Sequence, residues 1–161
     1  MPDVVCNTSP LQYLFQIGRL DLLPALLGRL IVPQAVVDEL AVGRAAGVPL
    51  PIPEALPWVD VRKPTSSPVL PLVTDLGPGE RQVLALALEM PGSVVILDDA
   101  LARRVATTLG IRLRGTLGIL LDAKRRSLVD RVAPLLDELQ ACRFRLSGET
   151  RVAILDAADE G

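Results

Sequence analysis

The stretch VVILDDALARRVATTLGI, residues 94–111, begins with an apolar run that ends on two adjacent carboxylates, Asp98 and Asp99. Residues 94–97 have the composition of a short buried strand, and residues 99–109 have the apolar spacing of a helix. The next strand is predicted at residues 111–113. A strand, a helix and a strand in this order predict two parallel strands joined by a crossover helix.

The same alternation extends outward through most of the chain. Strands are predicted at residues 3–6 and 30–32, and helices at 10–17, 20–27, 33–43 and 78–90. The first helix is expected to begin with a capping box over Ser9–Gln12, with Pro10 at its first position. The last third, residues 116–158, is predicted to be mostly helical. The expected fold is a three-layer α/β/α domain with a central parallel sheet.

Residues 43–77 interrupt this regularity. They hold seven of the fourteen prolines, and PLPIPEALP and KPTSSPVLP are typical of loops. One short strand is predicted between them, at residues 58–61. The flanking pieces are too short to form separate cores, so we expect residues 1–161 to form a single domain with an irregular insertion at about 43–77.

Composition excludes several classes of chemistry. The chain has no histidine, which excludes Ser-His-Asp and Cys-His catalysis. Two cysteines without histidine cannot supply a structural zinc site. No apolar run reaches the length of a membrane span and no signal peptide is recognisable, so a cytoplasmic protein without membrane contact is expected. The four aromatic residues leave Leu, Val, Ile and Ala to form the core, and predict little base stacking.

Oxygen-bearing side chains recur where the predicted strands end. Asn7 and the pair Asp98-Asp99 each follow a strand, and the carboxyl ends of parallel strands share one edge of a sheet. Glu80 precedes Val83 by three residues, which places it on the apolar face of its helix. Adjacent carboxylates repel each other unless a cation joins them, and such oxygen clusters suit Mg²⁺ or Mn²⁺. The pattern predicts a divalent-cation site.

Each of these residues also has an ordinary structural explanation. Asp99 would serve as the N-cap of the helix after it, and Glu80 as a first-turn acid favoured by the helix dipole. Asn7 fits a strand end. On the helix from Pro33, Asp38 and Glu39 both flank the apolar face, so spacing does not choose between them, and either one could lie on a solvated face.

The charge is uneven along the chain. The net charge is −2, but residues 101–131 hold eight bases against two acids, Asp122 and Asp130. The local excess of six could attract phosphates, although solvated helix faces would give the same pattern. The bases are Arg103, Arg104, Arg112, Arg114, Lys124, Arg125, Arg126 and Arg131.

Several short motifs, taken together and in order, resemble the PIN-domain proteins over nearly the whole chain. The similarity includes a branch of predicted nucleic-acid-binding PIN proteins that begin with Asn-Thr-Ser-Pro. The motifs are NTSPL (7–11), VPQAVVDEL (32–40), LGPGERQVLALALE (76–89), VVILDDALARRVATTLGI (94–111) and GTLGILLDAKRRSLV (115–129).

The resemblance implies an α/β/α fold and an Mg²⁺- or Mn²⁺-dependent ribonuclease. It also implies a possible toxin held by a small antitoxin, and a homodimer. It selects Glu39 over Asp38 and assigns catalysis to Glu39, Glu80, Asp98 and Asp99, with Asn7, Glu80, Asp98 and Asp99 as metal ligands. The residues expected to hold RNA are Thr8, Ser9, Arg103, Arg104, Lys124 and Arg125.

Asn7 departs from the family pattern, because active PIN nucleases usually have aspartate there. An amide ligates a hard cation without charge, so cation affinity should fall. This leaves a metal-dependent endoribonuclease and a non-catalytic nucleic-acid or partner-binding module as alternatives. A phosphoacceptor domain is a third, weaker reading, because the acidic pair comes after residue 90 rather than after the first strand.

Overall fold

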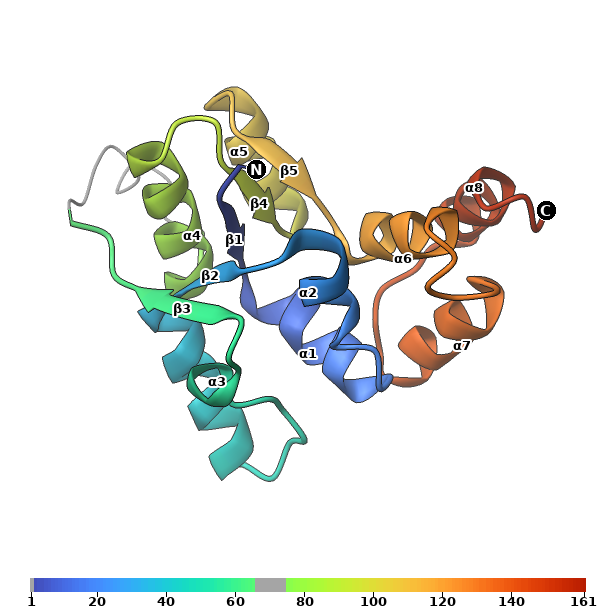
Figure 1. Ribbon diagram of the computed structural model, residues 1–161, viewed down its shortest axis with the longest axis horizontal. Helices are drawn as coiled ribbons and strands as arrows, with labels where there is room; N and C mark the ends of the chain where they lie inside the picture. The colour runs from blue at the N-terminus through green and yellow to red at the C-terminus, as the bar shows by residue number, and fades with distance from the viewer. Residues whose placement is uncertain (1, 66–74) are drawn as a thin grey trace.

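The computed structural model describes residues 2–65 and 75–161, which form an α/β fold around a five-stranded sheet (Figure 1). The strand order is β3-β2-β1-β4-β5, and every pair of neighbouring strands is parallel, as predicted. The strands are β1 Val4–Cys6, β2 Leu30–Pro33, β3 Val59–Arg62, β4 Val94–Ile96 and β5 Arg112–Arg114.

The order of the strands creates a switch point between β1 and β4. The chain moves outward from β1 to β3, then returns to the other side of β1. Because parallel crossovers are right-handed, this reversal puts helices on both faces of the sheet. The helices are α1 Thr8–Gln16, α2 Leu22–Leu27, α3 Gln34–Ala45, η1 Pro53–Ala55, α4 Pro78–Glu89, α5 Ala100–Thr108, α6 Thr116–Arg125, α7 Ala133–Ala141 and α8 Gly148–Ala157.

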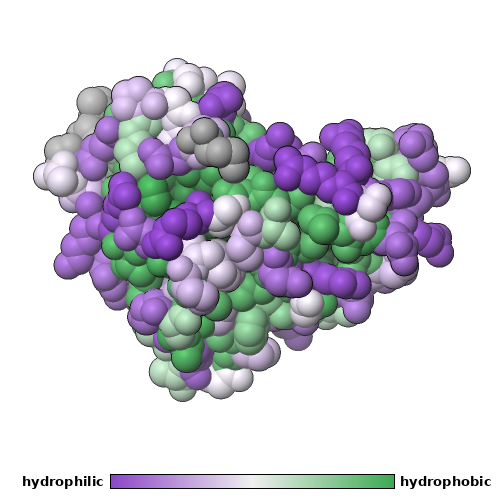
Figure 2. Space-filling view, in the orientation of Figure 1, coloured by the Kyte–Doolittle hydropathy of each residue, from purple (hydrophilic) through white to green (hydrophobic). Residues whose placement is uncertain are grey.

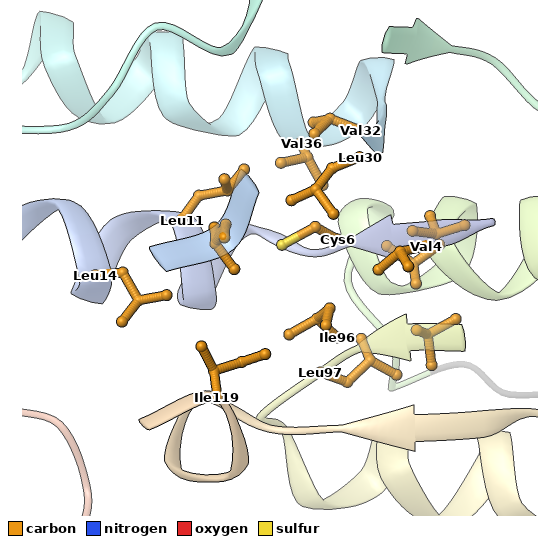
Figure 3. Close-up of a cluster of buried hydrophobic side chains, with 14 of the residues drawn as sticks. Val4, Cys6, Leu11, Leu14, Leu30, Val32, Val36, Ile96, Leu97 and Ile119 are labelled. Carbon is orange, nitrogen blue, oxygen red and sulfur yellow. The ribbon is translucent and has the colours of Figure 1, made fainter. Parts of the chain in front are cut away.

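The core is aliphatic and centred on β1. Figure 3 shows Cys6 between Leu30 and Val32 of β2 on one side and Ile96 of β4 on the other. Cys6 is fully buried. Burial, and secondarily the charge of Asp98, raises the pKa of its thiol, so the side chain stays neutral and unreactive. Cys6 therefore belongs to the core rather than to a reactive site.

Two expectations from the sequence need correction. α1 begins at Thr8 rather than Pro10, and its N-cap residue, Asn7, makes no capping bond through its side chain. The hydroxyl of Ser9 donates to Asp98 instead, so the predicted capping box is absent. α3 continues two residues further than expected, to Ala45. The short strand predicted at 58–61 is present as β3, an edge strand that pairs with β2 over four residues. Residues 66–74 of the predicted insertion lie outside the described residues.

The C-terminal third is helical, as predicted, and α6, α7 and α8 form a lobe beside the sheet (Figure 1). Hydrophilic residues gather around these helices on the face shown in Figure 2. No helix in residues 2–65 and 75–161 is long and apolar enough to cross a membrane.

Glu160 fastens the end of this lobe. Its carboxylate accepts hydrogen bonds from the backbone N–H groups of Val132 and Ala133, at 2.8 and 3.0 Å, and from Lys124 Nζ at 2.9 Å. Burial alone would raise the pKa of Glu160, but these donors and the charge of Lys124 outweigh it and lower the pKa to about 2. We call this arrangement the Glu160 lock. It joins the chain after α8 to α6 and to the start of α7.

Candidate active site

A pocket of about 390 Å³ opens where β1 and β4 run into α1 and α5. This is the switch point of the sheet, the place where open α/β folds bind ligands. All the acidic and amide residues singled out from the sequence line it: Asn7, Glu39, Glu80, Asp98 and Asp99. Residues up to 92 positions apart in the chain are thus brought together, and we call this space the acidic pocket.

Asp98 is the most heavily bonded of the acids. It accepts a hydrogen bond from Ser9 Oγ at 2.8 Å, and from the N–H and the hydroxyl of Thr116 at 2.8 and 2.6 Å. These bonds join the first turns of α1 and α6 to the end of β4. Asp98 therefore has a structural role in addition to facing the pocket, and its replacement would disturb both helix starts.

Asp99 is the N-cap of α5. Its Oδ2 accepts a hydrogen bond from the N–H of Ala102 at 2.9 Å, so the capping explanation is confirmed. The carboxylate is nevertheless exposed and lines the acidic pocket. The cap engages only Oδ2 of Asp99, so the carboxylate still contributes negative charge to the pocket.

Glu39, not Asp38, reaches the pocket. Glu39 is half-buried and accepts hydrogen bonds from Thr8 Oγ1 at 2.6 Å and from the N–H of Gly79 at 2.9 Å. Asp38 is exposed and accepts a hydrogen bond from Gln34 within α3. The location of Glu39 in the pocket therefore agrees with the family resemblance, which favoured Glu39 over Asp38. Helical spacing alone did not distinguish the two acids.

Glu80 is held in an unfavourable electrostatic environment. Burial raises the pKa of its carboxyl, and the charges of Glu39 and Asp99 raise it further, although a bond to its own backbone acts in the opposite direction. A carboxylate whose charge is destabilised in this way would be stabilised by a cation in the pocket.

Asn7 contributes an oxygen without a partner. The residue is 5% exposed, its backbone N–H donates to the carbonyl of Ile96, and its Oδ1 has no hydrogen-bond partner among the described residues. Buried polar atoms are almost always bonded, so such an atom calls for an explanation. A Cβ built on Gly79 would lie 3.0 Å from this Oδ1 and 2.9 Å from Glu39 Oε1. Glycine at position 79 therefore keeps open a small space that both oxygens face.

The donor chemistry of the pocket suits a hard divalent cation. Four carboxylates and the unpartnered amide oxygen of Asn7 surround it, and oxygen is the ligand that Mg²⁺ and Mn²⁺ prefer. In the described part of the chain, however, no three Asp, Glu, His or Cys side chains are grouped closely enough to enclose a metal ion. Asp98 and Glu39 turn toward neutral hydroxyl and amide donors instead. The residue types therefore fit a cation, while two of the acids are engaged with the fold.

The residues predicted to hold RNA are dispersed. Thr8 and Ser9 line the acidic pocket, but their hydroxyls donate to Glu39 and Asp98. Arg103 lines a neighbouring cavity, and Arg104 is exposed on α5.

Two of the predicted bases lie outside both cavities, on α6. Lys124 bonds Glu160 in the lock and the carbonyl of Ala158. Arg125 is exposed and lies 3.5 Å from Asp122. The basic run at residues 101–131 therefore does not form one surface beside the acids.

Sequence reasoning missed the residues on the far wall of the pocket. Arg143, Phe144 and Arg145 come from the loop between α7 and α8, and Tyr13 comes from α1. Nothing near position 144 marks it as part of a site that begins at Asn7. The one local signal is an aromatic residue between two arginines. Two of the four aromatic residues thus lie in this pocket, which the low aromatic content did not lead us to expect.

Comparison with known families agrees with this geometry. A family model described as a PIN domain matches residues 3–160, which is nearly the whole chain. No curated protein and no solved structure matches the chain. The parallel sheet with its acidic pocket and the family match together show that this chain belongs to the PIN-domain family.

Proposed function

We propose that this PIN domain is a divalent-metal-dependent endoribonuclease. PIN domains are generally nucleases, and those nucleases generally use divalent metal ions. The observation that carries the proposal is the convergence of Glu39, Glu80, Asp98 and Asp99, from three different parts of the chain, on one pocket that also contains the unpartnered oxygen of Asn7.

The residues would divide the work as follows. Asn7, Glu80, Asp98 and Asp99 would hold Mg²⁺ or Mn²⁺, which when bound polarises a phosphate oxygen and lowers the pKa of a water ligand. Glu39, fixed by the hydroxyl of Thr8 and the N–H of Gly79, would orient the attacking water. Ser9 and Thr116 hold the Asp98 carboxylate in one orientation, so the cation would meet a preorganised oxygen.

A second function is favoured by a specific observation. Asn7 supplies no charge, and Asp98 and Glu39 already accept five hydrogen bonds between them from neutral donors. A domain of this kind could keep the PIN fold and bind nucleic acid or a protein partner without cleaving RNA. Metal-dependent turnover separates the two functions.

The test is cleavage of a mixed-sequence RNA by the full chain in Mg²⁺, Mn²⁺ or EDTA. Glu80→Gln is the best variant, because it removes a pocket charge without removing the Asp99 cap or the Asp98 bonds. Glu138→Gln, on the exposed face of α7, is the matched control. We expect metal-dependent cleavage that falls by about 100-fold or more in Glu80→Gln and is unchanged in the control. Cleavage that survives Glu80→Gln would remove the nuclease assignment from this pocket.

The biological setting follows from the family resemblance alone. A toxin role, a small antitoxin partner and a homodimer are predictions that the described residues do not address. Co-purification of the chain with the product of a neighbouring reading frame would test the antitoxin partner, light scattering the homodimer, and arrest of cell growth on expression the toxin role.

A further inference from the structure

The loop between α7 and α8 lies between two cavities. On one side is the acidic pocket, and on the other is a cavity of about 640 Å³ whose lining includes Arg103 and Arg114. Asp98, Phe144 and Arg145 line both cavities, so the two cavities are adjacent along this loop. The basic residues that lie beside the acids therefore come from this loop and not from the basic run at residues 101–131.

The loop is fixed rather than loosely attached. The ring of Phe144 meets Tyr13 edge-on, with centroids 5.0 Å apart and an interplanar angle of 89°. Its N–H donates to the carbonyl of Leu139, and the N–H of Arg143 donates to Gln140, so both bonds close the end of α7. Arg143 has a φ of 70°, an uncommon conformation for a side-chain-bearing residue. This left-handed residue and the two bonds form an ordinary helix terminus, as Ser127 does after α6, and they fix the direction in which the loop leaves α7.

The two arginines of the loop have charge to offer a ligand. Arg143 and Arg145 are exposed, and within the described residues neither belongs to an ion pair. By contrast, Arg114 is paired with Asp122 at 2.5 Å, and Arg103 donates to the carbonyl of Leu97. The guanidinium groups next to the acidic pocket are therefore those of the loop.

We propose that Arg143–Phe144–Arg145 is the backbone-binding element for a single-stranded polynucleotide, a role that rests on the proposed nuclease function. Arg143 would bind a phosphate at the acidic pocket. Arg145, which lines both cavities, would bind a following phosphate, and the strand would continue into the cavity beside Arg103. Arginine matches phosphate geometry, and this contact needs no particular base.

The aromatic pair suits a single strand more than a duplex. Tyr13 and Phe144 both line the acidic pocket, and unpaired bases stack on aromatic rings without strong preference for sequence. Bases in a duplex are already stacked on each other and cannot use such a platform unless they are extruded.

The test is binding without turnover. The affinity of the full chain for a labelled mixed-sequence 12-mer RNA would be measured by fluorescence anisotropy in EDTA, across a series of salt concentrations. Arg143→Ala/Arg145→Ala is compared with Arg29→Ala/Arg112→Ala, which removes the same charge at the amino-terminal edge of the sheet. A duplex of the same sequence and a single-stranded DNA serve as further probes.

We expect at least tenfold weaker binding of single-stranded RNA by the loop variant and less than a twofold change in the control. The log–log salt slope should become shallower by about 1.4, because each neutralised phosphate of a single strand contributes about 0.7. Unchanged binding by the loop variant, or an equal loss in the control, would overturn the proposal. Equal weakening on the duplex would overturn the preference for a single strand.

The two proposals fail separately. If Arg143→Ala/Arg145→Ala loses RNA binding while the wild-type protein shows no metal-dependent cleavage, the loop binds RNA and the proposed nuclease function is wrong. If cleavage depends on Glu80 but is indifferent to the loop, the nuclease stands and the loop assignment is wrong.

Discussion

The acidic pocket and the Glu160 lock both hold partly buried carboxylates, and their energetics are opposite. In the lock, two backbone N–H groups and Lys124 surround one carboxylate and lower the pKa of Glu160 to about 2. In the pocket, burial and neighbouring negative charges raise the pKa of Glu80, and Asn7 Oδ1 has no partner among the described residues. The fold satisfies the acid of the lock, whereas in the pocket it leaves Glu80 beside like charges and Asn7 Oδ1 without a partner among the described residues, which marks the pocket as the place for a ligand.

The largest stability effect is expected at the lock. Glu160→Gln should lower the free energy of unfolding by about 2 kcal/mol, because hydrogen bonds to a charged acceptor are lost. Urea denaturation followed by circular dichroism would measure it. Glu149→Gln, exposed on α8, is the matched control and should change little. Equal stability of the two variants would show that the lock does not fasten the lobe.

Glu160 of the lock and Glu80 of the acidic pocket should change the free energy of unfolding with pH in opposite directions. The folded pKa of Glu160 lies below the ordinary value of 4.5, so its stabilisation is complete above about pH 4.5 and is lost as the pH falls toward 2. Wild type and Glu160→Gln should therefore converge in stability over that window. Glu80 has a raised pKa, so its contribution has the opposite sign and weakens the fold as the pH rises above 4.5. Parallel pH profiles of wild type and Glu160→Gln would contradict the assignment.

Asn7→Asp would sharpen the contrast by adding one more charge to the pocket. Without metal, the free energy of unfolding should fall by about 1 to 2 kcal/mol, because the new carboxylate is buried near Glu39. In saturating Mn²⁺ the loss should be recovered, and calorimetry should show tighter Mn²⁺ binding than in wild type. Asn7→Ser keeps the site neutral and serves as the control. A stability loss that Mn²⁺ does not reverse would argue against a cation between these oxygens.

Glu80→Gln should have the smallest effect on stability, and it should be favourable. Removing one of these mutually repelling carboxylates is expected to raise the free energy of unfolding by less than about 1 kcal/mol, because solvent screens the half-buried Glu80. The same variant is expected to lose cleavage. Thermal denaturation in EDTA beside Glu138→Gln would measure the gain. A destabilised Glu80→Gln would mean that its charge is already compensated in the folded protein.

Sequence pattern was sufficient for the sheet and its helices, because the three inner strands are short apolar runs and the long helices carry an apolar face. It also predicted β3, as the short strand at 58–61, although β3 alternates Val with Asp and Arg beside a proline-rich stretch. Local sequence failed at Ser9, whose hydroxyl has a tertiary partner, Asp98, 89 residues away. The sequence around Ser9 cannot show whether its hydroxyl will cap its own helix or donate to an acceptor that is distant in the chain.

The site was predictable in part for the same reason. Strand-end logic brought Asn7 and Asp98 together, and helical spacing brought in Glu80. The tie between Asp38 and Glu39 was not resolvable by spacing, because both flank the same apolar face. The wall formed by Arg143–Arg145 depends on how the C-terminal lobe packs against α1, and the Tyr13–Phe144 contact that sets it joins residues 131 positions apart.

Gly79 offers a way to silence the pocket while every ionisable group stays in place. A methyl group at this position would lie within 3.0 Å of Asn7 Oδ1 and both oxygens of Glu39. These are side-chain atoms rather than backbone, so Gly79→Ala should fold while displacing the oxygens that face this space. Such a variant would be a substrate trap, with the electrostatic surface of the wild type and no room for the chemistry. RNA recovered from cells on Gly79→Ala would report what the intact protein binds.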